Sequence, residues 1–450
     1  MPRMGSLCIT KCYGVKRRVF VSNSNLVFIS TSLPGPCRNW SACRKRNLSC
    51  PGPAIGLTRR TGIRTMRHPR TSQLNCPVMN RRQYLRKSGQ AALGFSLLPL
   101  AGCGSLEHSA KQAATELPVA DLERQVPKWL EEARVPGLSI AIIDRGRLAW
   151  NRGFGVTNTT SRAPVTTDTI FTCCSMSKPV FAYFVMKLCE KGVLGLDAPL
   201  TKYTPERYLQ GDPRLDLITA RHCLSHTTGF QNWREEGGNP LSIQFSPGTR
   251  WSYSGEGYAY LASVVARLMK QPLEDYMQAH VLSPFGMASS AYIWNESIGN
   301  RMAWPHDSEG RLLPKNKKPT HASVARYGSA GDLLTTPTDY ARFLIEVVAP
   351  KPSDEFRLTR ESRDEMLRPQ VPVPHSQQRS SWAIGWAIVH DGDHDFIYHS
   401  GDDTGWHTIG VASAANKSGF VAMTNGESGT QVLGKVLMSD SMQRFLKAGY

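Results

Sequence analysis

Acidic side chains are absent from the first 103 residues of this 450-residue chain, although the same segment holds 18 lysines and arginines. The remaining 347 residues carry 36 basic and 36 acidic side chains, so they have no formal net charge. The formal charge of +18 therefore belongs to the front segment alone. Because no basic footprint is left for the rest of the chain, we expect no nucleic-acid partner.

Apolar residues in the front segment do not run far enough to span a bilayer. The apolar stretch from residue 91 to 102 instead has the length of a signal-peptide core. It follows the pair Arg81-Arg82 and ends just before Cys103, in the sequence LAGC. This order resembles a twin-arginine export signal joined to a bacterial lipobox, with Cys103 as the lipidated first residue of the mature protein. The alternative is a buried apolar helix with a basic flank.

These features predict four parts. Residues 1–78 lack acidic residues, so we expect a disordered leader or a segment foreign to the native protein, which then begins at Met79. Residues 79–103 form the predicted signal peptide, 104–116 a tether and 117–450 one folded domain. We expect this domain to be exported to the periplasmic side and held at the membrane by its lipid.

Cysteine is scarce in the folded part. Seven of the eleven cysteines lie at or before Cys103, and the other four are residues 173, 174, 189 and 223. These four lack the paired spacing of a zinc site, and we expect them to be small buried hydrophobes. The run from Asp391 to Asp395 resembles a calcium loop but lacks the required glycine and closing glutamate, so it predicts a polar hairpin turn. No metal and no cofactor are expected.

Strand-like segments lie at both ends of the folded part, and helix-like segments lie between them. Strand patterns cover residues 137–155 (two strands around a turn), 169–172, 382–390, 395–400, 406–413 and 418–425. Helical patterns cover residues 117–133, 175–190, 257–268, 337–348, 361–367 and 430–447. The simplest packing is an α+β fold, in which one antiparallel sheet built from N- and C-terminal strands is flanked by helices, with a mainly helical insertion.

Ser175 and Lys178 lie one helical turn apart in the stretch FTCCSMSKPVFAYF. A serine hydroxyl needs a nearby base to act as a nucleophile. A lysine three residues later faces the same side of a helix, and burial would lower its pKa enough for it to accept a proton. The alternative is a helix-capping serine with a solvated lysine, and the spacing alone does not decide between the two.

Two further motifs follow in chain order. Tyr253 begins YSG just before a helix, where a neighbouring cation could lower its pKa, and His399 begins HSG on a predicted strand. Together with SxxK, these motifs resemble the serine beta-lactamase and penicillin-binding-protein family, and most closely its class C, DD-peptidase and esterase branch. Further matching stretches extend the resemblance over residues 117–448.

The resemblance implies a serine hydrolase with a small ester, amide or peptide substrate. It assigns Ser175 as the nucleophile, Lys178 as its activator, Tyr253 as general base and later general acid, and His399 as part of the proton network. The oxyanion hole would be the backbone N–H groups of Ser175 and Asp402. The implied substrate-binding residues are Gly255, Gly401 and Trp406, and a glycine such as Gly401 would let a substrate lie against the strand.

Two positions depart from the family pattern. Gly255 stands where relatives often have an asparagine that contacts the substrate amide. Asp402 and Asp403 follow the third motif, and their carboxylates would repel a β-lactam or D-Ala-D-Ala carboxylate. We therefore hypothesise that the substrates are neutral esters or carry an amine. The alternatives are a D-alanyl peptidase, an amine-recognising aminopeptidase or a β-lactamase, and a sensor of cell-wall fragments or β-lactams that has lost turnover.

Two aromatic residues near the motifs carry open alternatives. His226 in LSHTTGF is interpreted as a buried structural histidine rather than a catalytic one. Trp406 follows the third motif, and the sequence does not decide whether it lines the substrate cleft or only packs.

Overall fold

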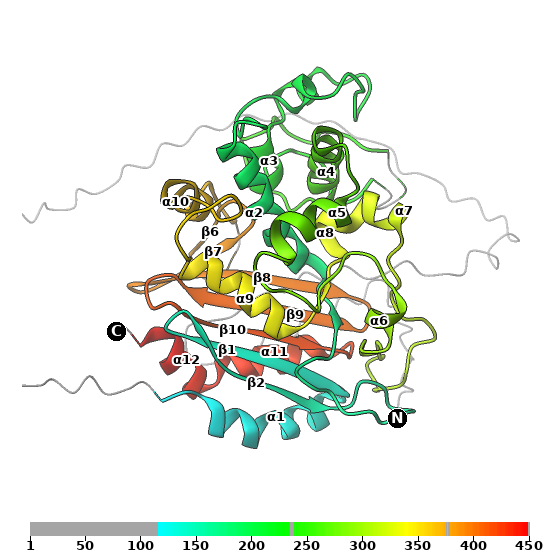
Figure 1. The fold of residues 1–450 in the computed structure, drawn as a ribbon, viewed down its shortest axis with the longest axis vertical. Helices are drawn as coiled ribbons and strands as arrows, with labels where there is room; N and C mark the ends of the chain where they lie inside the picture. Colours follow the sequence, from blue (N-terminus) through cyan, green and yellow to red (C-terminus); the bar gives the residue numbers. More distant parts are fainter. Residues whose placement is uncertain (1–115, 235–237, 239, 375, 377–378, 449–450) are drawn as a thin grey trace, which may run out of the picture. The chain divides into compact units, whose positions relative to one another are not determined.

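The computed structural model describes residues 116–448, apart from 235–237, 239, 375 and 377–378. The predicted leader, signal peptide and lipidation site at Cys103 lie outside the described residues. An eight-stranded antiparallel sheet crosses the described part in the order β2-β1-β10-β9-β8-β7-β6-β5 (Figure 1). Its strands are β1 (Gly137–Asp144), β2 (Arg147–Gly155), β5 (Val371–Pro372), β6 (Ser380–Trp382), β7 (Ala387–Asp391), β8 (His394–Asp403), β9 (Trp406–Ser413) and β10 (Ser418–Thr424).

The sheet joins the two ends of the folded part, as predicted. β1 pairs with β2 on one side and with β10 on the other, where Leu138 faces Thr424. A separate short pair joins β3 (Phe171–Thr172) to β4 (Leu334–Thr335). The polar turn predicted at residues 391–395 is the hairpin between β7 and β8, in which Asp391 faces His394.

Helices cover both faces of the sheet. Successive side chains of a strand point to opposite faces, and β1 accordingly supplies Ile140 and Ile142 to one apolar cluster and Ala141 and Ile143 to another. The first cluster packs against α1 (Val119–Ala133), α11 (Gly429–Met438) and α12 (Asp440–Lys447). The second includes α2 (Ser177–Glu190) and α9 (Pro337–Val348), which lies across the sheet in Figure 1.

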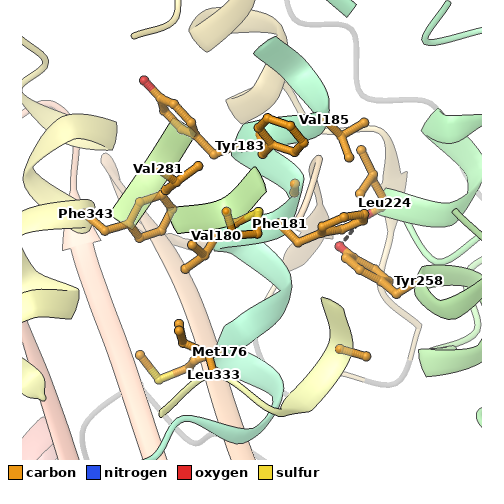
Figure 2. Packing of buried hydrophobic residues seen from close by; sticks show 14 of the residues in the cluster. Met176, Val180, Phe181, Tyr183, Val185, Leu224, Tyr258, Val281, Leu333 and Phe343 are labelled. Atoms are coloured by element: carbon orange, nitrogen blue, oxygen red, sulfur yellow. Dashed lines mark hydrogen bonds between the residues drawn. The ribbon is translucent and has the colours of Figure 1, made fainter. Parts of the chain in front are cut away.

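The helical part stands beside the sheet, and α2 lies in its core (Figure 1). Its other helices are α3 (Ala220–Leu224), α4 (Gly255–Met269), α5 (Leu273–Met277), α6 (Glu296–Gly299), α7 (His321–Ser323), α8 (Ser329–Gly331) and α10 (Arg360–Leu367). Twelve of the fourteen residues of α2 are buried, which is the pattern of a helix in the centre of a core. Figure 2 shows Phe181 and Tyr183 of α2 among Phe343 and Tyr258, whose hydroxyl donates to the carbonyl of Leu224 at 3.2 Å.

Two predicted elements are each divided in two. The single strand expected at 382–390 is wrong, because the chain turns at Gly385, whose φ is +81°. A Cβ on Gly385 would lie 2.7 Å from that of Ala182, so α2 passes too close for any other residue. The single helix expected at 430–447 breaks at Ser439, which is extended and whose side chain caps α12 by accepting from the Met442 N–H.

Among the described residues, every helix is too short or too polar to span a lipid bilayer.

Candidate active site

Ser175 lies on a short 3-10 turn, Cys174–Met176, that leads into α2. Cys174 has a φ of +52°, a left-handed conformation that costs an ordinary side chain about 1–2 kcal/mol. Neighbouring groups hold this turn in place. The Ser177 hydroxyl donates to the Cys174 carbonyl at 2.7 Å and accepts from the N–H of Leu333 at 3.1 Å. The serine is therefore presented by a strained backbone that the Ser177 hydroxyl holds in place.

Lys178 lies directly beside the serine. Its Nζ is 3.2 Å from Ser175 Oγ and donates to the carbonyl oxygen of Ala330 at 2.8 Å. The lysine is 1% exposed, and this burial lowers its pKa from 10.5 to about 7. The solvated-lysine alternative is therefore wrong. A buried amine that is half neutral near pH 7 is able to accept the serine proton.

Tyr253 completes this group. Its ring centroid lies 4.9 Å from Lys178 Nζ. The expectation that a neighbouring cation lowers its pKa is wrong. Burial raises the pKa of Tyr253 well above 10 and outweighs the opposing effect of the Ser175 side chain. Tyr253 is thus a neutral phenol, which donates or relays a proton but holds no free negative charge.

His399 lies on β8 within the same aromatic cluster, where its ring is 6.5 Å from Tyr253 and 5.6 Å from Trp382. Its Nδ1 is 2.6 Å from the carbonyl oxygen of Ser400, so Nδ1 carries the proton and Nε2 is an acceptor. Burial, and then the charge of Lys178, lower the pKa of His399 to about 3. His399 is therefore neutral, and it supplies no positive charge to a substrate carboxylate.

The end of β8 has one free edge near the turn that carries Ser175. β7 pairs with β8 only up to Tyr398, whereas β9 stays paired with it to Asp403. In an antiparallel ladder, alternate residues direct their N–H groups to opposite sides. Since Asp403 and Trp406 close a two-residue hairpin, the N–H of Asp402 points away from β9 and toward the free edge. This is the orientation that an oxyanion donor needs.

Gly401 is required by the packing of β8 against the turn that carries Ser175. A Cβ at this position would lie 2.4 Å from the Cys173 carbonyl oxygen and 2.5 Å from Thr408 Oγ1. The missing side chain therefore makes room for the turn that carries Ser175. The substrate contact expected at Gly401 stays a prediction. The glycine brings β8 and the serine turn into close contact.

Gly401→Ala is expected to lower the free energy of unfolding by about 1–3 kcal/mol, because it overpacks this contact. Gly434→Ala is the matched control, since a Cβ on this exposed glycine of α11 meets nothing within 4 Å. The control should gain up to about 1 kcal/mol from helix propensity. Urea unfolding of both variants tests this, and equal stabilities would contradict the close-contact explanation.

Gly255 is the first residue of α4 and lies against Trp233. A Cβ on Gly255 would lie 2.3 Å from Cζ2 of this indole. The loop that carries Trp233 is fixed to α4, because Asn232 accepts from the Gly255 N–H at 2.9 Å through its side chain. Trp233 thus occupies the space that an asparagine side chain at position 255 would need.

The structure resolves the two aromatic alternatives. Trp406 is 2% exposed and packs edge-on against Phe171 at 6.1 Å, so the packing alternative holds and the substrate-lining one is wrong. His226 is fully buried, as predicted, and its Nδ1 accepts from the N–H of Ser254 at 3.1 Å. Of the four expected buried cysteines, Cys173, Cys174 and Cys223 are buried and Cys189 is partly exposed.

Two charged clusters near the motifs were not predicted. Lys317 Nζ lies 3.1 Å from the carboxylates of both Asp332 and Asp403. The buried Glu256 accepts hydrogen bonds from Arg234, Arg326 and Tyr208, which outweigh its burial and lower its pKa to about 2. The cations of the two clusters, Lys317, Arg234 and Arg326, belong to no recognisable motif. No local signal in the sequence therefore predicts these ion pairs.

The carboxylates of Asp402 and Asp403, which follow the third motif, each have a partner in the structure. Asp402 Oδ1 lies 2.7 Å from Nδ1 of His407, and Lys317 is shared between Asp403 and Asp332. The cluster contains three carboxyl groups and one lysine. The expected repulsion of a substrate carboxylate is therefore reduced, and is not replaced by attraction.

Comparisons with known proteins find relatives of similar sequence. Esterase EstB of Burkholderia gladioli is 29% identical over 219 residues, which are 42% of this chain and 55% of the esterase, so the match spans about half of that relative. Penicillin-binding protein 4* of Bacillus subtilis is 24% identical over 327 residues, 65% of this chain and 69% of the relative.

Solved structures show the same fold. The octameric penicillin-binding protein homologue from Pyrococcus abyssi superposes with a TM-score of 0.61 at 24% identity, covering 72% of this chain and 77% of that one. D-alanine carboxypeptidase AmpC from Burkholderia cenocepacia gives a TM-score of 0.57 at 19% identity, covering 70% and 99%. The family model described as Beta-lactamase matches residues 119–436, and this chain therefore belongs to the beta-lactamase family.

Proposed function

We propose that this protein is a serine hydrolase that forms an acyl-enzyme on Ser175. One observation carries the proposal. The Nζ of a buried lysine with a pKa of about 7 lies 3.2 Å from the serine hydroxyl. This arrangement keeps a proton acceptor ready beside a nucleophile, which is the requirement for acyl transfer.

The proposed reaction begins when Ser175 Oγ attacks the substrate carbonyl carbon and its proton moves to the neutral amine of Lys178. The oxyanion that forms accepts hydrogen bonds from the N–H groups of Ser175 and Asp402. When the C–O bond to the leaving group breaks, Tyr253 donates its phenol proton to that oxygen and regains one from Lys178. Water then attacks the acyl-enzyme, and protons move in the reverse order to release the acid and restore Ser175.

The substrates that fit best are neutral or amine-bearing esters. A β-lactam or a peptide ending in D-alanine presents a carboxylate, whereas the neutral His399 offers it no charge and Asp402 and Asp403 oppose it. An amide substrate also lacks the family's asparagine contact, because Trp233 fills that space. Trp233 instead offers an apolar indole surface for an acyl or alcohol group.

Hydrolysis of p-nitrophenyl acetate and butyrate, compared with nitrocefin and a peptide ending in D-Ala-D-Ala, tests this proposal on residues 104–450. We expect the esters to be turned over at least about tenfold faster, as kcat/KM, than the two carboxylated substrates. Faster turnover of the peptide would favour the D-alanyl peptidase alternative, which the name of the Burkholderia cenocepacia structure also suggests. Covalent labelling by a fluorophosphonate without turnover of any substrate would favour the sensor.

The pH dependence follows from Lys178, which must be neutral to accept a proton. Because burial lowers its pKa to about 7, kcat/KM should rise tenfold per pH unit below about pH 7 and level off above it. An unshifted lysine would place this limb near pH 10 instead. Ester hydrolysis measured from pH 5 to 9 checks the limb, and a rate that is already constant at pH 5 would contradict the assignment of Lys178 as the base.

We also propose export and lipid anchoring at Cys103, supported by the sequence features of residues 79–103 alone. Full-length protein expressed in a bacterium with both export and lipoprotein processing should fractionate with membranes. The Cys103→Ser variant should lose that association. Equal membrane association of the two proteins would contradict the lipid anchor.

A further inference from the structure

We propose that Lys317 is a positioning residue of the active site, which ties the segment that orients Lys178 to the end of β8 that carries the oxyanion donor. This inference deepens the proposed function and rests on it. Lys317 lies in a loop between α6 and α7 that contains none of the three motifs. Nothing in the resemblance to the family assigns it a role.

The ammonium group of Lys317 is fully satisfied. Its Nζ lies 3.2 Å from the Gly331 carbonyl oxygen and 3.1 Å from one carboxylate oxygen each of Asp332 and Asp403. These three acceptors match its three N–H donors. Burial disfavours the charged form, but Asp403 and Asp332 outweigh it and raise the pKa of Lys317. Lys317 is therefore a fixed cation at every pH at which the enzyme is expected to work.

Two of these contacts, with Gly331 and Asp332, are made to the segment that also binds Lys178. The carbonyl of Ala330 accepts from Lys178, and the carbonyl of the next residue, Gly331, accepts from Lys317. Consecutive carbonyl groups of one short segment, residues 330–332, therefore accept hydrogen bonds from the two lysines. A shift of this segment would move the acceptor that fixes Lys178 Nζ beside Ser175.

The third contact of Lys317, with Asp403, is made to the end of β8. Asp403 is the last residue of β8 and follows Asp402, whose N–H is the proposed oxyanion donor. Lys317 thus bridges the segment behind the base and the strand behind the oxyanion hole. Fixing both relative to Ser175 matters, because small displacements of reacting groups lower rates by large factors.

Lys317 is also a charge that acts on Lys178. The titratable groups that face Lys178 are Cys174, His226, Tyr253, Tyr258, His399 and Lys317. Burial keeps the thiol and both phenols protonated and both imidazoles neutral. Burial is the largest cause of the lowered pKa of Lys178. Cys174 acts in the opposite direction, and the cation of Lys317 lowers the pKa further.

The test compares Lys317→Met with Lys317→Arg, which keeps the charge and can still reach both carboxylates. Lys318→Met is the matched control, because Lys318 is the next residue in the same loop and lies over the ring of Trp294 at 4.3 Å. Two readouts are needed. One is the acid limb of kcat/KM for p-nitrophenyl butyrate, and the other is the pKa of Lys178 by 13C NMR of labelled lysine, assigned with Lys178→Arg.

Lys317→Met removes a cation and leaves two carboxylates without it, and both changes raise the pKa of Lys178. We expect both readouts to move upward by at least about 0.5 unit, which is a threefold loss of kcat/KM on the acid limb. The plateau should also fall about tenfold through kcat, with Lys317→Arg recovering most of it and Lys318→Met leaving both readouts in place.

A merely structural ion pair would lower the melting temperature without moving either readout, and that result would overturn the inference. If Lys317→Met does not fold, Lys317→Arg and Asp403→Asn still test it, because Asp403→Asn breaks the bridge on the β8 side and should lower kcat. An unchanged kcat in Asp403→Asn would overturn the inference as well. Failure of the proposed function is distinguishable, since the wild type would then hydrolyse no ester while the NMR titration still reports on Lys317.

Discussion

Ser175→Ala is expected to lower kcat/KM for p-nitrophenyl butyrate by at least about 10³-fold. Removing Oγ removes the only atom that forms the proposed covalent bond, and the oxyanion donors and Lys178 cannot replace it. The fold should be unaffected, because the turn is held by Ser177 and Leu333 rather than by Ser175. Initial rates together with a thermal melt check both expectations.

The matched control for this change is Ser263→Ala. Ser263 lies on α4 and its hydroxyl donates to the carbonyl of Tyr260 at 2.7 Å, so the variant makes the same chemical change away from the site. It should keep kcat/KM within about twofold of the wild type, because Ser263 makes only a local hydrogen bond within its helix and its loss should not disturb the fold. A Ser175→Ala protein that retains ester turnover at the wild-type rate would show that the hydrolysis belongs to another group or to a contaminant.

Lys178→Met is the second change with a large expected effect, a loss of about 10²–10⁴ in kcat/KM. Methionine has a similar length, keeps the site filled and cannot accept a proton. The same change should stabilise the protein at pH 7, because burying an amine whose pKa falls from 10.5 to about 7 costs free energy. A catalytic loss together with a stability gain is the expected mark of a functional buried lysine.

The sign of the pH dependence of stability follows from the same pKa. Between about pH 7 and pH 10.4 the unfolded lysine holds a proton that the folded one has lost, so wild-type stability should rise by about 1.4 kcal/mol per pH unit from this residue. Lys178→Met lacks this contribution. Urea unfolding of both proteins at pH 7 and pH 9 measures the difference. A stability gap that does not narrow at pH 9 would contradict the lowered pKa.

The parts of the fold that could be predicted from the sequence are those with a clear period. The strands at 406–413 and 418–425 and the helix at 337–348 match the observed elements within a residue. The break at Gly385 could not be predicted, because it depends on how closely α2 approaches this turn. The break at Ser439 interrupts a pattern that is apolar at helical spacing on both sides.

In the site too, the sequence predicted what depends on local spacing and did not predict what depends on distant residues. The spacing of the motif predicted that Ser175 and Lys178 lie together, since residues three positions apart lie on the same face of a helix. It failed for the pKa of Tyr253, because the extent of burial depends on residues far away in the sequence. Lys317 and Trp233 lie in loops with no period, and only the folded chain brings them beside Asp403 and Gly255.

The most direct test of the central claim is to label the folded protein with a fluorophosphonate and to locate the adduct by mass spectrometry of its peptides. If Ser175 is the nucleophile, one adduct forms, on Ser175. It forms faster as the pH rises from 6 to 8 and Lys178 loses its proton, and it is absent in Ser175→Ala. An adduct on another residue, or none on a folded protein that hydrolyses esters, would contradict it.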